Sequence, residues 1–253
     1  MSGHSKWANI KYRKAAVDAQ KSKIFSKIIR EIMVAAKQGG GNPETNPRLR
    51  NAMERAKRYN VPSDSVEKAI ARGTGQGGVT YEDVIYEGYG VGGVALLVEA
   101  TTDNKNRTTA ELRRILSRNG GSLGEAGCVA WMFERKGIIV VDKDVVDEDR
   151  ILEVALEAGA EDVRVEDDRY EVITQPSDLY RIREVMISAG ITPHHSELTV
   201  IPKTTVKVED KDAEKVLNLI EALEEHEDVQ RVYSNFDISD EEMERVAAAM
   251  DRA

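Results

Sequence analysis

The sequence predicts an α+β multidomain fold: an N-terminal basic three-helix bundle followed by two α/β sandwich-like domains, one ferredoxin-like and inserted into the other. Three observations predict it. Charge is segregated along the chain, the first third has helical periodicity, and the remainder alternates helical patterns with β-rich runs. A chain of 253 residues, of which 41% are hydrophobic, is long enough for two or three domains with their own cores.

The charge divides sharply, although the formal net charge of the whole chain is −9. Residues 1–80 hold 16 Lys and Arg against 6 Asp and Glu, whereas the remaining residues hold 20 against 39. A single charge run is most often a solvated face. Here the division covers a whole candidate domain, which favours one end that faces a polyanion and a body that stays in solvent.

Three helices are expected in the basic part. Residues 24–37 place apolar side chains on one face and Lys23, Lys27, Arg30 and Lys37 on the opposite one, and residues 39–41 (GGG) end this helix. Asn46 and Pro47 indicate an N-cap followed by proline at the first helical position. A third helix is expected to begin at residues 63–64 with a capping box that ends in Glu67, and to stop at Gly73.

Residues 6–21 differ from these helices because no apolar stripe stands clear of the charges. Trp7 shares its helical face with Lys6 and Arg13. We expect a marginal helix in the free protein that becomes ordered when phosphates neutralise it. The alternative is a disordered, solubilising tail.

The glycines at 73–78 (GTGQGG) predict a joint, after which β-rich runs begin. Gly88, Gly90 and Gly93 satisfy G-x-G-x-x-G, but strand-like runs flank them on both sides, so we expect a hairpin and no dinucleotide site. A helix over 107–118 and a buried strand ending in CVAWMF (128–133) follow.

From residue 137 the pattern is strand (GIIVV), helix 147–158, strand (DVRV), strand (YEVIT), helix 177–188 and strand (ELTVI), which is the order of a ferredoxin-like unit. A helix over 210–225, a strand (VQRVYSNF) and an acidic helix from residue 239 remain. We therefore expect a basic helical domain at 1–78, a discontinuous α/β domain at 79–135 plus 204–253, and an acidic ferredoxin-like domain at 136–203.

The residues that carry chemistry do not assemble into a familiar catalytic or metal site. His4, His194, His195 and His226 with the single Cys128 have no zinc-site spacing, and nucleophile-elbow and P-loop motifs are absent. We expect no enzyme, no cofactor and no metal. One cysteine, no membrane-length apolar run and no secretion signal favour a cytoplasmic protein that does not enter a membrane. The sequence leaves the oligomeric state open.

Nucleic acid is the expected partner, either duplex DNA or ribosomal RNA. Lys and Arg side chains bind phosphates without reading sequence, and no helix with a base-reading face is evident, so shape and backbone recognition should dominate. The candidate binding residues lie on the N-terminal arm, the first helix and a cationic stripe of the helix at 107–118. They are Lys6, Trp7, Lys11, Arg13, Lys14, Lys21, Lys23, Lys27, Arg30, Arg107, Arg114 and Arg118.

Four stretches carry a resemblance to a known family: GHSKWANIKYRKAAVDAQKSKIFSKIIREI, RAKRYNVPSDSVEKAIARGTG, YEGYGVGGVALLVEATTDNKNRT and GCVAWMFERKG. They resemble the YebC/PmpR family of probable transcriptional regulatory proteins, which is related to a mitochondrial translational activator of a cytochrome oxidase subunit. The resemblance implies an N-terminal helical domain, two α/β domains and control of gene expression without enzymatic activity. Cys128 stands where Ser is expected in many members.

The resemblance leaves two functions open. One is a DNA-binding transcriptional regulator, and the other is a ribosome-associated translation factor that relieves stalling at proline-rich stretches. The family's signature would include the following residues of this chain: Gly3, His4, Ser5, Lys6, Trp7, Lys11, Arg13 and Lys14.

Overall fold

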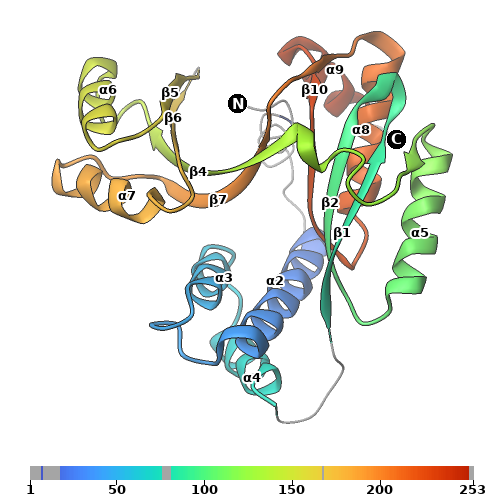
Figure 1. Cartoon of the computed structure of the whole chain (residues 1–253), viewed down its shortest axis with the longest axis horizontal. Coiled ribbons are helices and arrows are strands. Elements are labelled where there is room, and N and C mark those ends of the chain that lie inside the picture. Colours follow the sequence, from blue (N-terminus) through green and yellow to red (C-terminus); the bar gives the residue numbers. More distant parts are fainter. Residues whose placement is uncertain (1–6, 8–17, 76–80, 167, 251–253) are drawn as a thin grey trace.

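The structure is a computed structural model that describes residues 7, 18–75, 81–166 and 168–250. Within them it contains eight α-helices and ten strands. A helical bundle is followed by two α/β domains, one of them ferredoxin-like and inserted into the other (Figure 1), so the predicted fold class is confirmed. The boundaries of the discontinuous domain and of the ferredoxin-like domain stay a prediction. Among the described residues, no helix is both long and apolar enough to cross a membrane.

The bundle consists of α2 (Asp18–Gly39), α3 (Pro47–Arg58) and α4 (Ser63–Gly73). Its own apolar cluster is centred on Ile28, Ile32 and Leu49, which are fully buried. Asn46 caps α3 as predicted, because its side-chain oxygen accepts a hydrogen bond of 3.1 Å from the backbone N–H of Leu49.

The predicted capping box at the start of α4 is wrong. No side chain caps this helix, whose first residue follows Pro62. Asp64 instead forms an ion pair of 2.6 Å with Lys68, one turn further along the exposed face.

The discontinuous domain is built on a four-stranded sheet with the order β3-β1-β2-β9. Its strands are β1 (Glu82–Tyr89), β2 (Ala95–Thr102), β3 (Ser122–Leu123) and β9 (Val229–Ser234). The 3-10 helix η1 (Val91–Gly93) closes the predicted β1–β2 hairpin, where Gly92 takes a φ of 71°. A short parallel pair, β8 (Val206–Lys207) with β10 (Phe236–Asp237), and α9 (Asp240–Met250) complete the domain.

The two faces of β2 pack against different partners. Leu96 and Val98 contact the cluster formed with α5 (Lys105–Arg118) and α8 (Asp210–Glu224). Ala95 and Leu97 point to the other face, where a second apolar cluster includes Phe133 at the start of β4 (Phe133–Asp142), Val200 of β7 (His195–Pro202) in the ferredoxin-like domain, and Tyr233 of β9. Alternation along one strand therefore joins the two α/β domains through apolar contacts.

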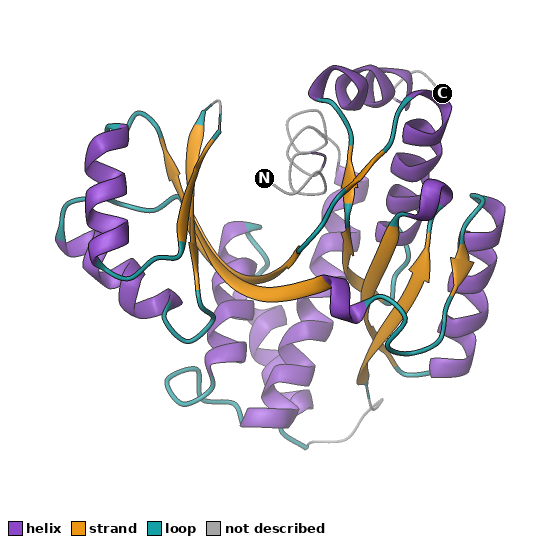
Figure 2. Cartoon of the chain, turned by 45° about the horizontal axis from the view of Figure 1, so that its top comes forward, coloured by secondary structure: helices purple, strands orange, loops and turns teal. Residues whose placement is uncertain are grey.

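The ferredoxin-like domain has the strand order β5-β6-β4-β7, and every neighbouring pair is antiparallel. Its elements are β4 (Phe133–Asp142), α6 (Glu148–Glu157), β5 (Asp162–Val165), β6 (Arg169–Thr174), α7 (Leu179–Ser188) and β7 (His195–Pro202). Figure 2 shows the long strands β4 and β7 running between this domain and the sheet of the discontinuous domain. After β7 the chain returns to the first sheet, since β9 pairs with β2.

The predicted strand over CVAWMF (128–133) is wrong except for its last residue. Residues 130–132 form the 3-10 helix η2, and β4 begins at Phe133. The cause lies on β1: the carboxylate of Glu87 accepts hydrogen bonds from the backbone N–H groups of Gly127, Val129 and Ala130 at 2.6, 2.7 and 2.8 Å. A backbone wrapped around one carboxylate cannot also be extended, and it leaves Trp131 exposed at 65%.

Candidate nucleic-acid interface

Of the twelve predicted binding residues, Lys6, Lys11, Arg13 and Lys14 lie outside the described residues. Lys21 belongs to α2, and its side chain is not described. The geometry of the interface is therefore built from the other seven, which lie on α2, on α5 and at position 7.

Trp7 is fully buried in the apolar cluster of the discontinuous domain, together with residues such as Leu112 of α5 and Phe236 of β10. In this conformation its ring is not available to stack on a base, contrary to its place among the predicted binding residues. The sequence also indicates no reason for this segment to dock on its own protein. For Trp7 itself the structure supplies one, because a buried indole removes a large apolar surface from water.

The cations of α2 do not form a free face. Lys23 forms an ion pair of 3.7 Å with Glu225, and the Lys27 ammonium donates a hydrogen bond to the backbone carbonyl of Glu224. Arg30 donates to the backbone carbonyl of Glu227 at 2.6 Å. It also pairs with the carboxylate of Asp228. All these partners lie in residues 224–228 (EEHED), which run from the last residue of α8 to the residue before β9.

Two of the three α2 cations, Lys27 and Arg30, are largely buried in the contact with residues 224–228. The Arg30 side chain is only 16% exposed. Burial of the Lys27 ammonium lowers its pKa to about 8, and the repulsion of Arg55, Lys23 and Arg30 acts in the same direction against the attraction of Glu224. Three cations crowded on one helix face are thus compensated by the acidic body.

Asp228 is the centre of the contact, and its side chain is 3% exposed. One carboxylate oxygen accepts from Arg30 at 2.9 Å, and the other accepts from Arg107 at 2.8 Å, from the Thr108 hydroxyl at 2.7 Å and from the Thr102 hydroxyl at 3.2 Å. Burial alone would raise the pKa of Asp228, but the bonds from Arg107 and Thr108 outweigh it and leave this pKa below its ordinary value.

Asp228 is not predicted from the sequence. It is one of four acidic residues in the stretch EEHED (224–228), directly before a predicted strand, and no local pattern separates it from its neighbours. Its role depends on helices that are more than a hundred residues away in the chain. Only the pairing of β9 with β2, which brings the end of that run to α5 and α2, could have indicated it.

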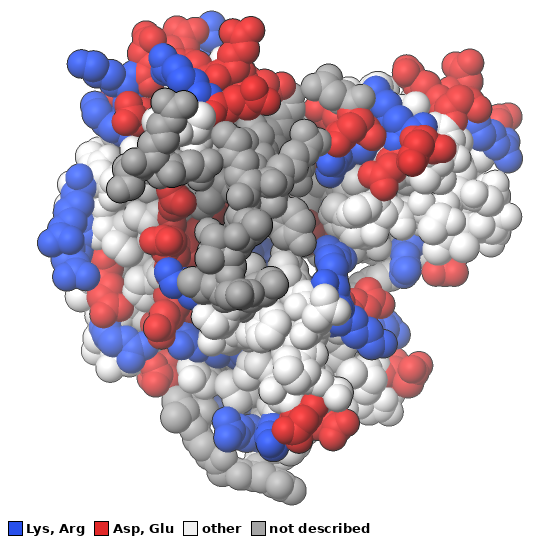
Figure 3. Space-filling model, turned by 180° about the vertical axis from the view of Figure 1, so that it is seen from behind, with Lys and Arg blue, Asp and Glu red and all other residues white. Residues whose placement is uncertain are grey.

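The α5 face is the exposed cationic surface among the predicted residues. Arg107 is 44% exposed and pairs with Asp103 at 2.9 Å as well as with Asp228. Arg114 and Arg118 are exposed, and no carboxylate within the described residues forms an ion pair with either. Figure 3 shows basic side chains gathered on the side of the molecule that α5 occupies, at the left edge of the view.

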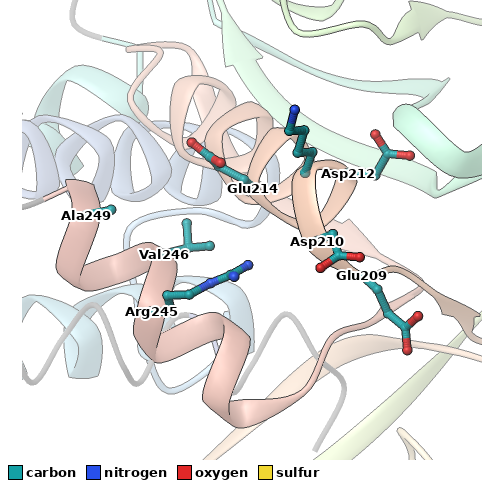
Figure 4. A pocket seen from close by; sticks show the side chains of 8 residues that line it. Glu209, Asp210, Asp212, Glu214, Arg245, Val246 and Ala249 are labelled. Carbon is teal, nitrogen blue, oxygen red and sulfur yellow. The ribbon is translucent and has the colours of Figure 1, made fainter.

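A second surface feature is an open depression of about 820 Å³ between the start of α8 and α9 (Figure 4). Four carboxylates line it, with two cations and two small apolar residues: Glu209, Asp210, Asp212, Glu214, Lys211, Arg245, Val246 and Ala249. Among the described residues, no group of three His, Cys, Asp or Glu could hold a metal ion. The excess of carboxylates repels phosphate, which separates this depression from the interface.

The fold and the distribution of its cations define a three-domain α+β protein with a helical N-terminal domain docked on an acidic body. The chain belongs to the TACO1/YebC family. The family model described as the TACO1/YebC protein N-terminal domain matches residues 5–76, and the model of the TACO1/YebC second and third domain matches residues 81–236. The resemblance stated from the sequence is thereby confirmed.

Relatives with curated names are similar over nearly the whole chain. A protein of Dictyoglomus turgidum is 60% identical over 243 residues, 95% of this chain and 98% of that protein. One of Thermosipho melanesiensis is 56% identical over 253 residues, 99% of this chain and 100% of that protein. Both are named probable transcriptional regulatory protein. A crystal structure of a conserved hypothetical protein from Aquifex aeolicus is similar with a TM-score of 0.80 and 48% identity, covering 89% of this chain and 93% of that one.

Proposed function

We propose that this protein is a cytoplasmic, nucleic-acid-binding regulator of gene expression that needs no cofactor and catalyses no reaction. It contacts the phosphate backbone through the α5 face and the basic residues before α2. The observation that carries the proposal is the pair Arg114 and Arg118, exposed cations on a helix of an otherwise acidic domain. The names of the relatives support a role in transcription.

Backbone contacts fit the bundle better than base reading does. Residues 59–62 link α3 to α4, and a link of four residues is short enough for a helix-turn-helix arrangement. The exposed face of α4 lacks Asn and Gln, however, and pairs Asp64 with Lys68. A recognition helix needs side chains that read base edges, so this bundle is suited to shape and phosphate recognition.

The second candidate is a ribosome-associated translation factor, and the missing base-reading face favours it. Structured RNA is recognised mainly by shape and backbone contacts, which the same cations can supply. The ferredoxin-like domain, in which residues 136–203 hold 16 Asp and Glu against 8 Lys and Arg, would then face proteins or solvent.

A charge-reversal pair tests the α5 interface. Arg114→Glu with Arg118→Glu should weaken binding to duplex DNA and to ribosomal RNA alike, and should reduce the slope of log affinity against log salt by about 1.8 on duplex DNA. The matched control is Arg150→Glu with Arg164→Glu, which changes the same charge on the ferredoxin-like domain. Equal affinities for the α5 variant and its control, with equal salt slopes, would remove α5 from the interface.

Sedimentation separates the two candidate functions. Lysate treated with deoxyribonuclease is run through a gradient at low and moderate salt, and the position of the protein is compared with that of the ribosomes. Comigration that the α5 variant loses supports the translation factor. Protection of one promoter, with a penalty of ~1–3 kcal/mol for each mismatched base pair, supports the transcriptional regulator.

A further inference from the structure

We infer that the cationic face of α2, formed by Lys23, Lys27 and Arg30, is a second phosphate-binding site that the protein covers with its own residues 224–228, and that a nucleic acid displaces this acidic segment. The inference rests on the proposed function and deepens it, because it assigns regulation to the same binding activity. The contacts, the exposure of their members and the way in which the bundle is attached each support it.

The acidic segment meets the α2 cations as a phosphate strand would. Lys23, Lys27 and Arg30 are spaced at i, i+4 and i+7, so they lie in a row along one side of the helix. Each faces oxygens of the segment: a carboxylate for Lys23, a backbone carbonyl for Lys27, and carboxylates with a carbonyl for Arg30. A row of oxygen acceptors along a cationic helix is the pattern that a nucleic-acid backbone presents.

The contacts that Glu225 and Glu227 make with α2 are open to exchange. The side chains of Lys23, Glu225 and Glu227 are 52%, 58% and 81% exposed. Ion pairs between exposed side chains are weak and are screened by salt. A duplex offers a dense and regular row of phosphates, with one charge for about every 1.7 Å of its axis, which two exposed glutamates do not match.

The hydrogen bonds that Asp228 accepts from α5 do not depend on the position of α2. If Arg30 leaves, the carboxylate of Asp228 keeps the bonds from Arg107 and from the Thr108 hydroxyl. No uncompensated buried charge is created, which is the usual obstacle to breaking a buried ion pair. Asp228 therefore holds Arg30 of α2 by a bond whose loss leaves the carboxylate paired.

The bundle is attached to the body through polar contacts, which favours movement. Its apolar cluster is separate from the clusters of the other domains. Further attachments include the 2.6 Å ion pair of Arg48 with Asp83 and the 2.7 Å hydrogen bond that the Tyr180 hydroxyl donates to Asn51. Polar interfaces between domains allow relative motion, whereas the two α/β domains share an apolar cluster.

Removing the exposed charges of the segment tests the inference. Glu225→Gln with Glu227→Gln should bind a short DNA duplex and an RNA hairpin about fivefold more tightly than the natural chain. The control, Glu214→Gln with Glu244→Gln, changes net charge equally at exposed positions of α8 and α9, and its gain should be clearly smaller. Thermal melting of all variants checks that they fold.

A second arm asks whether the α2 cations then touch phosphate. Lys23→Gln should cost little affinity in the natural chain, where Glu225 engages this lysine, and severalfold more in the Glu225→Gln, Glu227→Gln background. Equal gains for variant and control, or equal costs of Lys23→Gln in both backgrounds, would overturn the inference and leave the proposed function standing. If the natural chain bound neither probe in dilute buffer, the proposed function itself would fail.

Discussion

The carboxylate of Asp228 joins two domains, and removing its charge should destabilise the discontinuous domain. Asp228→Asn keeps the size of the side chain but replaces one acceptor oxygen by an amide NH2 group, which can only donate. The Thr102 and Thr108 hydroxyls are fully buried and donate to this group, so they cannot turn to water. Arg107, at 44% exposure, can be rehydrated.

The expected loss of unfolding free energy follows from the four hydrogen bonds that the Asp228 carboxylate accepts. Hydrogen bonds to a charged group contribute ~1.5–3 kcal/mol each, but the Thr108 hydroxyl can donate instead to the carbonyl of Asn104, 3.1 Å away, and the arginines recover part of their hydration. We therefore expect Asp228→Asn to cost about 3 kcal/mol of unfolding free energy. The control Asp103→Asn removes only a partly exposed partner of Arg107 and should cost less than about 1 kcal/mol.

The two tryptophans supply the assay. Trp7 is fully buried in the cluster of the discontinuous domain, whereas Trp131 is 65% exposed. In a Trp131→Phe background, the emission of Trp7 reports the unfolding of this domain in urea. A loss of 3 kcal/mol lowers the midpoint by about 1 M if the slope is close to 3 kcal/mol per molar urea.

Acid adds a second readout for the same variant. The pKa of Asp228 lies below its ordinary value in the folded protein, so its ionised form stabilises the fold at every pH above the ordinary value of about 3.9. This stabilisation is lost as the pH falls through the folded-state pKa. The difference between the natural chain and Asp228→Asn should therefore shrink below about pH 4. A midpoint for Asp228→Asn as high as that for Asp103→Asn would refute the reasoning.

Two further predictions concern a loop and a helix contact. Glu87→Gln should cost about 2 kcal/mol, which chemical denaturation measures, because the amide keeps one acceptor oxygen and its NH2 group cannot accept from the backbone N–H that faced the other oxygen. It should also speed reaction of the Cys128 thiol with an aromatic disulfide at fixed pH, because burial and then the charge of Glu87 hold that thiol's pKa above its ordinary value. Gly73→Ala should lower the melting temperature of the bundle, measured by far-ultraviolet circular dichroism, with a cost of ~1–3 kcal/mol. The added methyl group would collide with the carbonyl oxygen of Met33 and with the side chain of Ala36.

Glu87→Gln and Gly73→Ala each have a control substitution close by in the chain or in the structure. Glu125→Gln removes the weaker of the two carboxylates that act on Cys128 and should change the rate less than Glu87→Gln does. Ala71→Ser, at an exposed position of α4, should stay within about 0.5 kcal/mol of the natural chain. A thiol rate that is the same in both glutamate variants, or a Gly73→Ala chain as stable as Ala71→Ser, would contradict the structure.

Local patterns in the sequence predict much of the fold because they act over a few residues. Asn46 followed by proline marks the start of α3, and the glycines at 90–93 mark a hairpin. The order of strands and helices from β4 to β7 follows from the alternation of two periods, 2 and 3.6 residues. These features depend on backbone preferences that neighbouring residues set.

The parts that the sequence does not predict depend on distant residues. The start of β4 is set by Glu87, some forty residues earlier, and the docking of Trp7 by a cluster that includes β10. The pairing of Arg30 with Asp228 joins residues almost two hundred positions apart. A count of charges along the chain measures how many cations a segment holds, but only the structure distinguishes a cation that faces solvent from one that is already neutralised.

The difference between exposed and neutralised cations changes how the segregation of charge along the chain relates to function. Part of the positive excess of residues 1–80 is neutralised by the acidic segment 224–228, while the exposed arginines of α5 belong to the acidic body. Arg30 and Arg107 meet at the two oxygens of one carboxylate, so the cationic face of α2 and the α5 face are adjacent at Asp228. A phosphate polymer that displaces the segment would therefore extend from one face to the other and bridge two domains. Affinity then depends on how the bundle sits on the body, and the first third of the chain alone would hold only one side of the site.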